Sequence, residues 1–279
     1  MRKPDWLKVP LPNTREFMEV RGILDRLDLH SVCQEARCPN MGECFQSRTA
    51  TFLILGNKCT RNCRYCNVQD GQPGVPDENE PERLAEAVKA LGLRYVVITS
   101  VTRDDLTDGG AALFARCIEL LRKEIADCRV EVLIPDLQGN WTALQRILAS
   151  GPHVLNHNIE VVPRLFGELR PRGNYALSLE LLRRAGEDYR KALTKSGFMV
   201  GFGETRDEIL SLLDDLAEVA CASLTIGQYL QPSAAHWPVA KFYMPDEFED
   251  FRQEALLRGF KTVVSGPLVR SSYQAAKQA

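Results

Sequence analysis

The chain has 279 residues, of which 44% are hydrophobic and 26% charged, and this composition is typical of a globular protein that buries a full core. The formal net charge of −2 excludes a global attraction to nucleic acid or to an anionic membrane surface. Apolar runs stay below the roughly 18 residues needed to span a bilayer, and the N-terminus has no signal-peptide h-region. We therefore expect a soluble, cytoplasmic monomer with no nucleic-acid or membrane partner.

From Thr51 onward, short apolar runs alternate with longer amphipathic stretches, a pattern typical of βα units with a parallel sheet. Six or so units are too few for the eight of a complete TIM barrel. The predicted fold class is α/β, as a partial (β/α)6-type TIM barrel, with a doubly wound sheet as the alternative. Strands are expected at 51–55, 95–99, 129–134, 153–158, 192–200, 223–229 and 262–264, and helices at 80–91, 110–125, 141–149, 177–185, 205–219 and 245–258.

Three segments follow from this pattern. Residues 1–50 show little periodicity and are expected to form an N-terminal extension organised by a metal site. Residues 51–264 form the predicted barrel, and residues 265–279 form a short polar tail that contains RSSY.

Six of the nine cysteines lie between Cys33 and Cys66. The odd total and this crowding argue against an extracellular disulfide framework and favour thiolates that bind metal in a reducing compartment. The other three cysteines, Cys117, Cys128 and Cys221, are isolated and are expected to be buried structural thiols.

The segment CTRNCRYC places Cys59, Cys63 and Cys66 in C-x3-C-x2-C spacing directly after the first strand, where barrel folds carry their chemistry. Three soft thiolates can bind one face of a [4Fe–4S] cluster and leave one iron open. A zinc site commonly takes four ligands in paired C-x2-C spacing, and no partner pair is adjacent. The spacing therefore favours a cluster.

The segment CQEARCPNMGEC places Cys33, Cys38 and Cys44 in C-x4-C-x5-C spacing. This trio also predicts a cluster that is one ligand short. A zinc site or scattered core thiols remain alternatives for it.

CTRNCRYC resembles the signature of radical S-adenosylmethionine (SAM) enzymes, with Tyr65 at the position of its aromatic residue. That resemblance implies SAM on the open iron and its cleavage to a 5′-deoxyadenosyl radical. Seven segments, in order over nearly the whole chain, resemble the lipoyl synthase family: CQEARCPNMGEC, TATFLILGNKCTRNCRYCNV, TSVTRDDLTDGGA, LNHNIEVVPRL, KSGFMVGFGET, TIGQYLQPS and GPLVRSSY.

The resemblance implies insertion of two sulfur atoms, at C6 and C8, into an octanoyl chain on a lysine of a lipoyl carrier domain. An unactivated methylene has no proton acidic enough for a general base, which agrees with radical chemistry. The resemblance further implies that Ser272 of RSSY is the fourth ligand of an auxiliary [4Fe–4S] cluster on Cys33, Cys38 and Cys44, and that this cluster donates the sulfur. Implied partners are the carrier (a 2-oxoacid dehydrogenase E2 subunit or the glycine cleavage H protein), an electron donor such as ferredoxin or flavodoxin, and an iron–sulfur carrier that rebuilds the cluster.

Candidate SAM and substrate contacts follow the later strands. They are Tyr65, Thr99, Ser100, Asn156, Asn158, Glu160, Arg170, Gly201 and Gly203. Arg103 to Asp105 could pair with SAM or form a solvated turn, and His157 is expected to be a core histidine. Two other functions stay open from the residues alone, a cluster carrier or electron-transfer protein and a different radical SAM enzyme with an auxiliary cluster.

Overall fold

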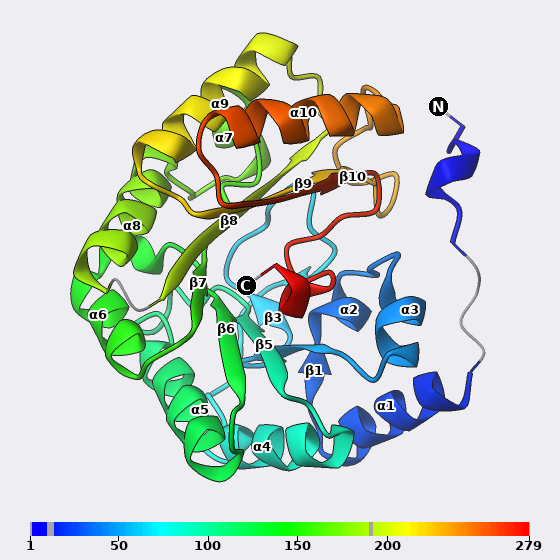
Figure 1. The fold of residues 1–279 in the computed structure, drawn as a ribbon. Helices are drawn as coiled ribbons and strands as arrows, with labels where there is room; N and C mark the ends of the chain where they lie inside the picture. Colours follow the sequence, from blue (N-terminus) through cyan, green and yellow to red (C-terminus); the bar gives the residue numbers. More distant parts are fainter. Residues whose placement is uncertain (1, 10–13, 190–191, 279) are drawn as a thin grey trace. The chain divides into compact units, whose positions relative to one another are not determined.

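A computed structural model describes residues 2–9, 14–189 and 192–278 (Figure 1). The chain divides into an N-terminal unit, Pro10–Arg61 with Asn67–Leu155, and a C-terminal unit, Met1–Val9 with Asn62–Cys66 and Asn156–Ala279. Among the described helices, none has the length and apolar character to cross a membrane.

The strands of the N-terminal unit are β1 (His30–Ser31), β2 (Thr51–Ile54), β5 (Tyr95–Ser100) and β6 (Arg129–Leu133). β1 pairs with β2 in antiparallel fashion, whereas β2 pairs with β5, and β5 with β6, in parallel fashion. All four residues of β2 are buried, as in parallel strands that are covered on both faces. Figure 1 shows α4 (Glu80–Leu91) and α5 (Ala111–Glu124) on the outer side of these strands, and α6 (Trp141–Ala149) beside α5.

Residues 14–50 are mostly helical, with α1 (Arg15–Arg26), α2 (Val32–Glu35) and α3 (Met41–Gln46). The expectation of little periodicity was wrong here, because α1 is amphipathic. Its apolar residues Phe17, Val20, Ile23 and Leu24 are buried and recur at helical spacing. The Phe17 ring lies 5.3 Å from the ring of Phe45 in α3. Apolar packing between α1 and α3 therefore supports the segment that carries the first three cysteines.

The C-terminal unit holds the parallel strands β8 (Leu193–Val200), β9 (Ser223–Gln228) and β10 (Thr262–Gly266). Its helices are α7 (Pro163–Leu169), α8 (Tyr175–Asp188), α9 (Arg206–Glu218) and α10 (Pro245–Leu257). They surround a core that includes Phe198, Leu212 and Phe251. α9 begins with a capping box between Thr205 and Glu208, which bonds otherwise unpaired N–H groups of its first turn.

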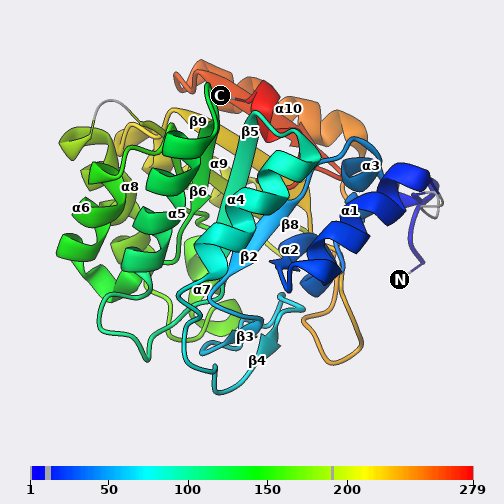
Figure 2. The ribbon, with the colours of Figure 1, turned by 90° about the horizontal axis from the view of Figure 1, so that it is seen from below.

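The predicted strands and helices are all found, and most bounds move by no more than two residues. The predicted strand 153–158 is shorter, since β7 spans Val154–Asn156 and carries the chain from the N-terminal to the C-terminal unit. Two short strands, β3 (Lys58–Cys59) and β4 (Gln69–Asp70), form a separate parallel pair, and Figure 2 shows them side by side. Three 3-10 turns complete the elements: η1 (Asp5–Leu7), η2 (Leu137–Gly139) and η3 (Ala275–Lys277).

Candidate functional site

The cysteine trio Cys33, Cys38 and Cys44 lies on two short helices of the N-terminal unit and the turn between them. Cys33 is in α2, whose N-terminus is capped by Ser31, and Cys44 is in α3. The N–H of Cys38 donates to the carbonyl of Cys33 over 3.0 Å. The three cysteines, which are close together in the sequence, therefore also lie within one unit of the structure.

Burial and mutual repulsion act on these thiols. Burial raises the pKa of Cys33 to about 12, and the charge on Cys38 adds to that effect. Burial also raises the pKa of Cys44 to about 12, with further contributions from Cys33 and Cys38. Their negative charges would therefore need a cationic partner, and a bound metal cluster supplies one while displacing the protons.

Thiolates are the usual ligands of iron–sulfur clusters, and the two cysteine trios supply six of them. In the part of the chain that the structure describes, no three His, Cys, Asp or Glu side chains are arranged to hold one metal ion. A [4Fe–4S] cluster takes its thiolates on different iron atoms, so its ligands stand farther apart than those of zinc. All nine cysteines are free of disulfide bonds, so none of the six clustered thiols is lost to a disulfide. Cys117, Cys128 and Cys221 are buried, as predicted for structural thiols.

Cys59, the first cysteine of the second trio, lies in β3 of the N-terminal unit. Cys59 pairs with Asp70 of β4, and its carbonyl accepts from the N–H of Gly71 over 2.9 Å. The N–H of Arg61 points back to Cys59 Sγ over 3.4 Å. The thiol is therefore fixed by its own strand and also receives a peptide N–H.

The guanidinium of Arg61 is buried between Asp104, which follows β5, and Asp136, which follows β6. Its nitrogens donate to the two oxygens of Asp104 over 2.7 and 2.8 Å and to those of Asp136 over 2.6 and 2.7 Å. Burial opposes the charge on Arg61, but the bonds to Asp136 and Asp104 outweigh it and raise the pKa of Arg61. We call Arg61, Asp104 and Asp136 the arginine fork. Sequence analysis missed it, since Arg61 carries no ligand signal of its own.

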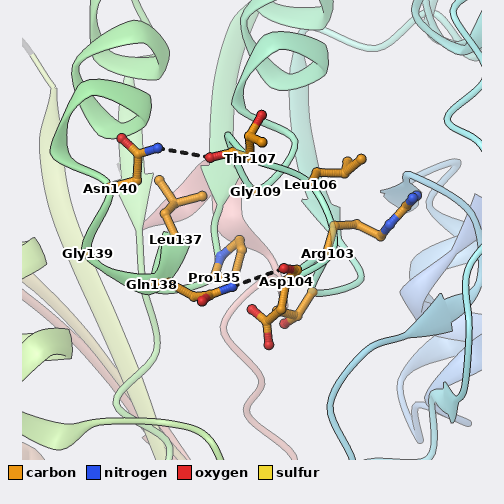
Figure 3. Close-up of a pocket in the computed structure, with 11 residues that line it drawn as sticks. Arg103, Asp104, Leu106, Thr107, Gly109, Pro135, Leu137, Gln138, Gly139 and Asn140 are labelled. Carbon is orange, nitrogen blue, oxygen red and sulfur yellow. Dashed lines mark hydrogen bonds between the residues drawn. The ribbon is translucent and has the colours of Figure 1, made fainter.

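A polar pocket of about 290 Å³ borders Asp104 (Figure 3). It is lined by the loops after β5 and β6, where barrel enzymes carry their sites. Figure 3 shows Gln138 Nε2 donating to the carbonyl of Asp104 over 3.2 Å and Asn140 Nδ2 donating to that of Thr107 over 3.1 Å. Both bonds join the two loops, so the pocket has a rigid wall.

The predicted contacts at the end of β5 differ in their bonding. Thr99 Oγ1 donates to the carbonyl of Leu133 over 2.9 Å, whereas the buried Oγ of Ser100 has no hydrogen-bond partner among the described residues. Arg103 pairs with Asp105 and bonds the carbonyls of Leu55 and Gly74. Of these side chains, Ser100 has an unsatisfied polar group that a ligand would satisfy.

Cys63 and Cys66, the other two cysteines of the second trio, lie in the C-terminal unit. The N–H of Arg64 donates to the carbonyl of Leu169, at the end of α7, over 2.8 Å. Trp237 donates its N–H to the carbonyl of Arg64 over 2.9 Å, and the Arg64 guanidinium lies 4.9 Å from the Trp237 ring centroid. These contacts fix the peptide between the two cysteines.

The carbonyl of Cys66 lies 3.0 Å from His236 Nε2. Sequence analysis assigned no role to His236, and this contact gives it a structural one. His157 is buried and its Nε2 lies 2.9 Å from Ser178 Oγ. That contact confirms the prediction of a core histidine. Asn156, at the end of β7, is fully buried.

Tyr65 belongs to the cysteine loop, and its side chain is buried near Glu160 in the same unit. Its ring is 6.2 Å from that of Phe202. Burial raises its pKa well above the usual value, and the charges of Glu160 and Cys63 add to the effect. Tyr65 is therefore a neutral phenol next to a carboxyl group.

Asn158 connects Glu160 to the RSSY segment. Its Nδ2 donates to Glu160 Oε1 over 3.1 Å and to Ser271 Oγ over 3.2 Å, while its buried Oδ1 has no partner among the described residues. Arg170 Nη1 donates to the carbonyl of Asn158 over 3.0 Å. Burial raises the pKa of Glu160, and Arg170 opposes this rise. Sequence analysis named Asn158, Glu160 and Arg170 but missed Ser271, the partner of Asn158.

Gly201 and Gly203, the two glycines predicted as SAM or substrate contacts, adopt backbone conformations that favour glycine. Gly201 has φ +115°, and a Cβ there would lie 2.2 Å from Gln228 Nε2. Its N–H donates to Glu204 Oε1 over 2.6 Å. Gly203 has φ +107° and faces Ala240. Glu204 and Gln228 thus hold this turn, and neither was identified from the sequence.

Ser272 lies in the turn that follows β10, in the C-terminal unit. The preceding residues are tightly held. Val269 approaches Gly227 so closely that a Cβ on Gly227 would lie 2.2 Å from the Val269 carbonyl oxygen, and Arg270 Nη1 donates to that oxygen over 2.7 Å.

Two family models match the chain. One describes the radical SAM superfamily and matches residues 53–216, and the other describes the N-terminal domain of lipoyl synthase of the radical SAM family and matches residues 1–38. Lipoyl synthase of Chloroflexus aurantiacus is 56% identical over 98% of this chain and 90% of its own length. Lipoyl synthase of Symbiobacterium thermophilum is 54% identical over 99% of this chain and 87% of its own.

Solved structures share the fold. SuiB of Streptococcus suis, in a crystal structure with bound S-adenosylmethionine, matches with a TM-score of 0.59 at 12% identity, over 81% of this chain and 54% of its own. Methylornithine synthase matches with a TM-score of 0.56 at 14% identity, over 91% of this chain and 82% of its own. At these identities the likeness shows the fold alone, and it confirms the predicted α/β partial barrel of the radical SAM kind.

Proposed function

The chain belongs to the lipoyl synthase family of radical SAM enzymes, and from this premise we propose which residues carry out the reaction. The family inserts sulfur at C6 and C8 of an octanoyl group attached to a lysine of a protein substrate. The observation that carries the assignment is the presence of two cysteine trios, each one ligand short of a complete cluster site, in a chain 56% identical to a lipoyl synthase.

We assign the radical SAM cluster to Cys59, Cys63 and Cys66. With SAM bound, this cluster supplies the radical that removes hydrogen from the octanoyl chain. The backbone contacts of β3 and of Arg64 hold the three thiols in place. Tyr65 of this loop packs against Phe202, with ring centroids 6.2 Å apart, and places apolar surface beside the proposed site.

We assign SAM and substrate contacts to the residues predicted from the sequence. The structure supports some of these residues more directly than others. Ser100 Oγ and Asn158 Oδ1 support the assignment most directly, because each is buried and has no hydrogen-bond partner in the described part of the chain. A buried polar atom in that state costs about 1–3 kcal/mol, which a ligand hydrogen bond removes. Thr99, Arg170 and Gly201 are bonded within the protein, so their proposed role is to shape the site. Asn156, Glu160 and Gly203 are proposed to complete it.

We assign the auxiliary cluster, which is the sulfur-donating substrate, to Cys33, Cys38 and Cys44 in the N-terminal extension, with Ser272 of the C-terminal tail as the fourth ligand. A serine alkoxide is a hard ligand on a cluster held by soft thiolates. Ser272 should therefore be the first ligand to leave when sulfur is removed. The bond from Asn158 to Ser271 supports this role, since it holds the residue next to Ser272 when the ligand dissociates.

The partners are proposed from the chemistry. The protein substrate is an octanoylated lipoyl domain, either an E2 subunit of a 2-oxoacid dehydrogenase or the glycine cleavage H protein. Reduction of the radical SAM cluster requires a low-potential donor such as ferredoxin or flavodoxin, and an iron–sulfur carrier restores the auxiliary cluster. Nine cysteines without a disulfide support a reducing compartment, the cytoplasm.

Anaerobic reconstitution tests the assignment. The full chain should bind about eight iron and eight sulfide per molecule, cleave SAM to 5′-deoxyadenosine and add two sulfur atoms to an octanoyl-lysine peptide, as seen by mass spectrometry. About four iron per chain, with SAM cleavage but no sulfur transfer, would contradict the auxiliary cluster.

A further inference from the structure

The arginine fork ties the Cys59 loop to the carboxyl ends of β5 and β6. Four short charge-assisted bonds hold one guanidinium between two carboxylates, and such bidentate pairs fix orientation as well as charge. Thr60 adds to the anchorage, because its N–H and Oγ1 both donate to the carbonyl of Thr102, over 3.0 and 2.9 Å. Residues 60 and 61 therefore have little freedom.

This anchorage determines where one peptide N–H points. The N–H of Arg61 donates to Cys59 Sγ over 3.4 Å, and hydrogen bonds to ligand sulfurs are among the factors that set the reduction potential of iron–sulfur clusters. We propose that Arg61 is a positioning residue, which holds this N–H on Cys59 and, with Asp104 and Asp136, sets the potential and retention of the bound cluster. The inference rests on the proposed function, since it takes Cys59 as a cluster ligand.

The N–H donated to Cys59 Sγ stabilises negative charge and so raises the reduction potential of the bound cluster. The net charge of the arginine fork acts in the opposite direction and lowers this potential. One arginine and two aspartates leave one net negative charge, and a negative charge disfavours the more negative, reduced cluster. The side chain of Asp136 is 1% exposed and that of Asp104 is 18% exposed. Because water screens exposed charges, Asp136 should influence the potential more than Asp104.

A neighbouring ion pair provides a matched control. Arg103 is buried and pairs with Asp105, like Arg61 with its aspartates, but its other bonds go to the carbonyls of Leu55 and Gly74. The Asp105 side chain is 40% exposed. Asp105→Asn therefore removes the same charge from an adjacent pair without touching the Cys59 loop.

The test is a redox titration of the reconstituted full chain, followed by electron paramagnetic resonance with and without SAM. SAM identifies the cluster with the open iron, because only that signal should change when SAM binds. Asp136→Asn should raise the midpoint potential of this SAM-responsive cluster, Asp104→Asn should raise the potential less, and Asp105→Asn should leave it unchanged. Equal potentials in Asp136→Asn and the wild type would overturn the electrostatic part of the proposal.

Positioning is tested separately from charge. Arg61→Lys keeps the positive charge but cannot bond two carboxylates in fork geometry, and Thr60→Val removes only the hydroxyl bonds. Both variants should release iron from the SAM-responsive cluster to a chelator several-fold faster than the wild type and Asp105→Asn. Wild-type rates in both would overturn the positioning role. If the wild type itself forms no SAM-responsive cluster, the proposed function fails instead.

Discussion

The two cysteine trios are built on different supports. Cys33, Cys38 and Cys44 lie on α2, α3 and the turn between them, and all three belong to the N-terminal unit. Cys59, Cys63 and Cys66 lie on a single loop, where the first is held by contacts in the N-terminal unit and the other two by contacts in the C-terminal unit.

The supports match the proposed fates of the two clusters. The loop trio is held by main-chain bonds and by the arginine fork, none of which depends on iron, so its cluster site can survive repeated turnover. The helical trio also has main-chain bonds, such as that from the N–H of Cys38 to the carbonyl of Cys33, but its buried thiols repel one another when ionised. Binding of a cluster would remove that repulsion. The difference agrees with the proposal that one cluster is a lasting cofactor and the other a substrate.

Removing one cysteine from each trio gives the largest expected effect. Cys63→Ala should abolish SAM cleavage and product formation together, because the radical SAM cluster is lost. Cys38→Ala should retain SAM cleavage yet yield no sulfur-containing product. Iron content in each variant should fall to about half of the wild-type value, as measured by a colorimetric iron assay.

Cys128→Ala is the matched control, since Cys128 is a buried thiol outside both trios. It should keep the full iron content and both activities. Loss of SAM cleavage in Cys38→Ala would contradict the separation of the two sites.

Ser272→Cys tests the fourth ligand of the auxiliary cluster. A thiolate is a softer ligand than an alkoxide and should hold the cluster more firmly, while product formation should fall at least about tenfold, because ligand release is slowed by about 1.4 kcal/mol or more. Ser271→Ala removes only the bond from Asn158 and no proposed cluster ligand, so it should lower product formation less than Ser272→Cys. Full double insertion by Ser272→Cys, measured by mass spectrometry of the carrier peptide, would show that Ser272 need not leave.

Gly227→Ala should disturb the helical trio's site through the RSSY segment alone. The added Cβ would lie 2.2 Å from the carbonyl oxygen of Val269, so the segment must shift at a cost of about 1–3 kcal/mol. The variant should lose iron from the auxiliary cluster and keep SAM cleavage, which iron counting and chromatography of 5′-deoxyadenosine would show.

Gly186→Ala serves as its control. A Cβ there makes an ordinary contact of 3.6 Å with Thr194 inside α8, where alanine is favoured over glycine by up to about 1 kcal/mol. A Gly227→Ala enzyme with normal product formation would mean that RSSY does not reach the auxiliary cluster.

Glu80→Gln should change only the pH dependence of stability. Glu80 is buried, and its Oε2 accepts the N–H of Leu55, which precedes the cysteine loop, over 2.9 Å. Burial raises the pKa of Glu80 to about 7. The unfolded chain releases this proton near pH 4.5 and the folded chain near pH 7, so stability is lost as pH rises between these values, by up to about 3 kcal/mol.

Glutamine keeps an acceptor for Leu55 without a charge. Glu80→Gln should therefore unfold at a higher temperature than the wild type at pH 8 and at a similar temperature near pH 4.5. Equal melting temperatures at pH 8 would show that Glu80 ionises without cost.

The sequence predicted elements that carry strong local signals. α4 and α6 were predicted to the residue, helped in α4 by Pro81 in the first turn and Gly92 after its end. α1 was missed because the polar residues between its apolar positions obscure the pattern, and its burial comes from tertiary contacts such as Phe17 against Phe45. α7 was missed because seven residues show too little periodicity.

The two proposed ligand sets could be predicted from the sequence because cysteine spacing is a local property. The arginine fork was not, since Asp104 and Asp136 lie 43 and 75 residues from Arg61 and only the fold brings them together. The same holds for the bond between Asn158 and Ser271, which are 113 residues apart. Polar residues after parallel strands could be predicted to converge, but not which of them would bond one another and which would stay unsatisfied.

The shortness of α2 and α3 has a consequence for the supply of product. These helices have four and six residues, far below the roughly 12–15 at which an isolated helix becomes stable in water. Once the auxiliary cluster has given up its sulfur, we expect this segment to open readily and to accept a new cluster. Under the proposed function each enzyme molecule is a stoichiometric reagent between two such repairs, and the output of a cell is then expected to follow the delivery of new clusters more closely than the amount of octanoylated protein.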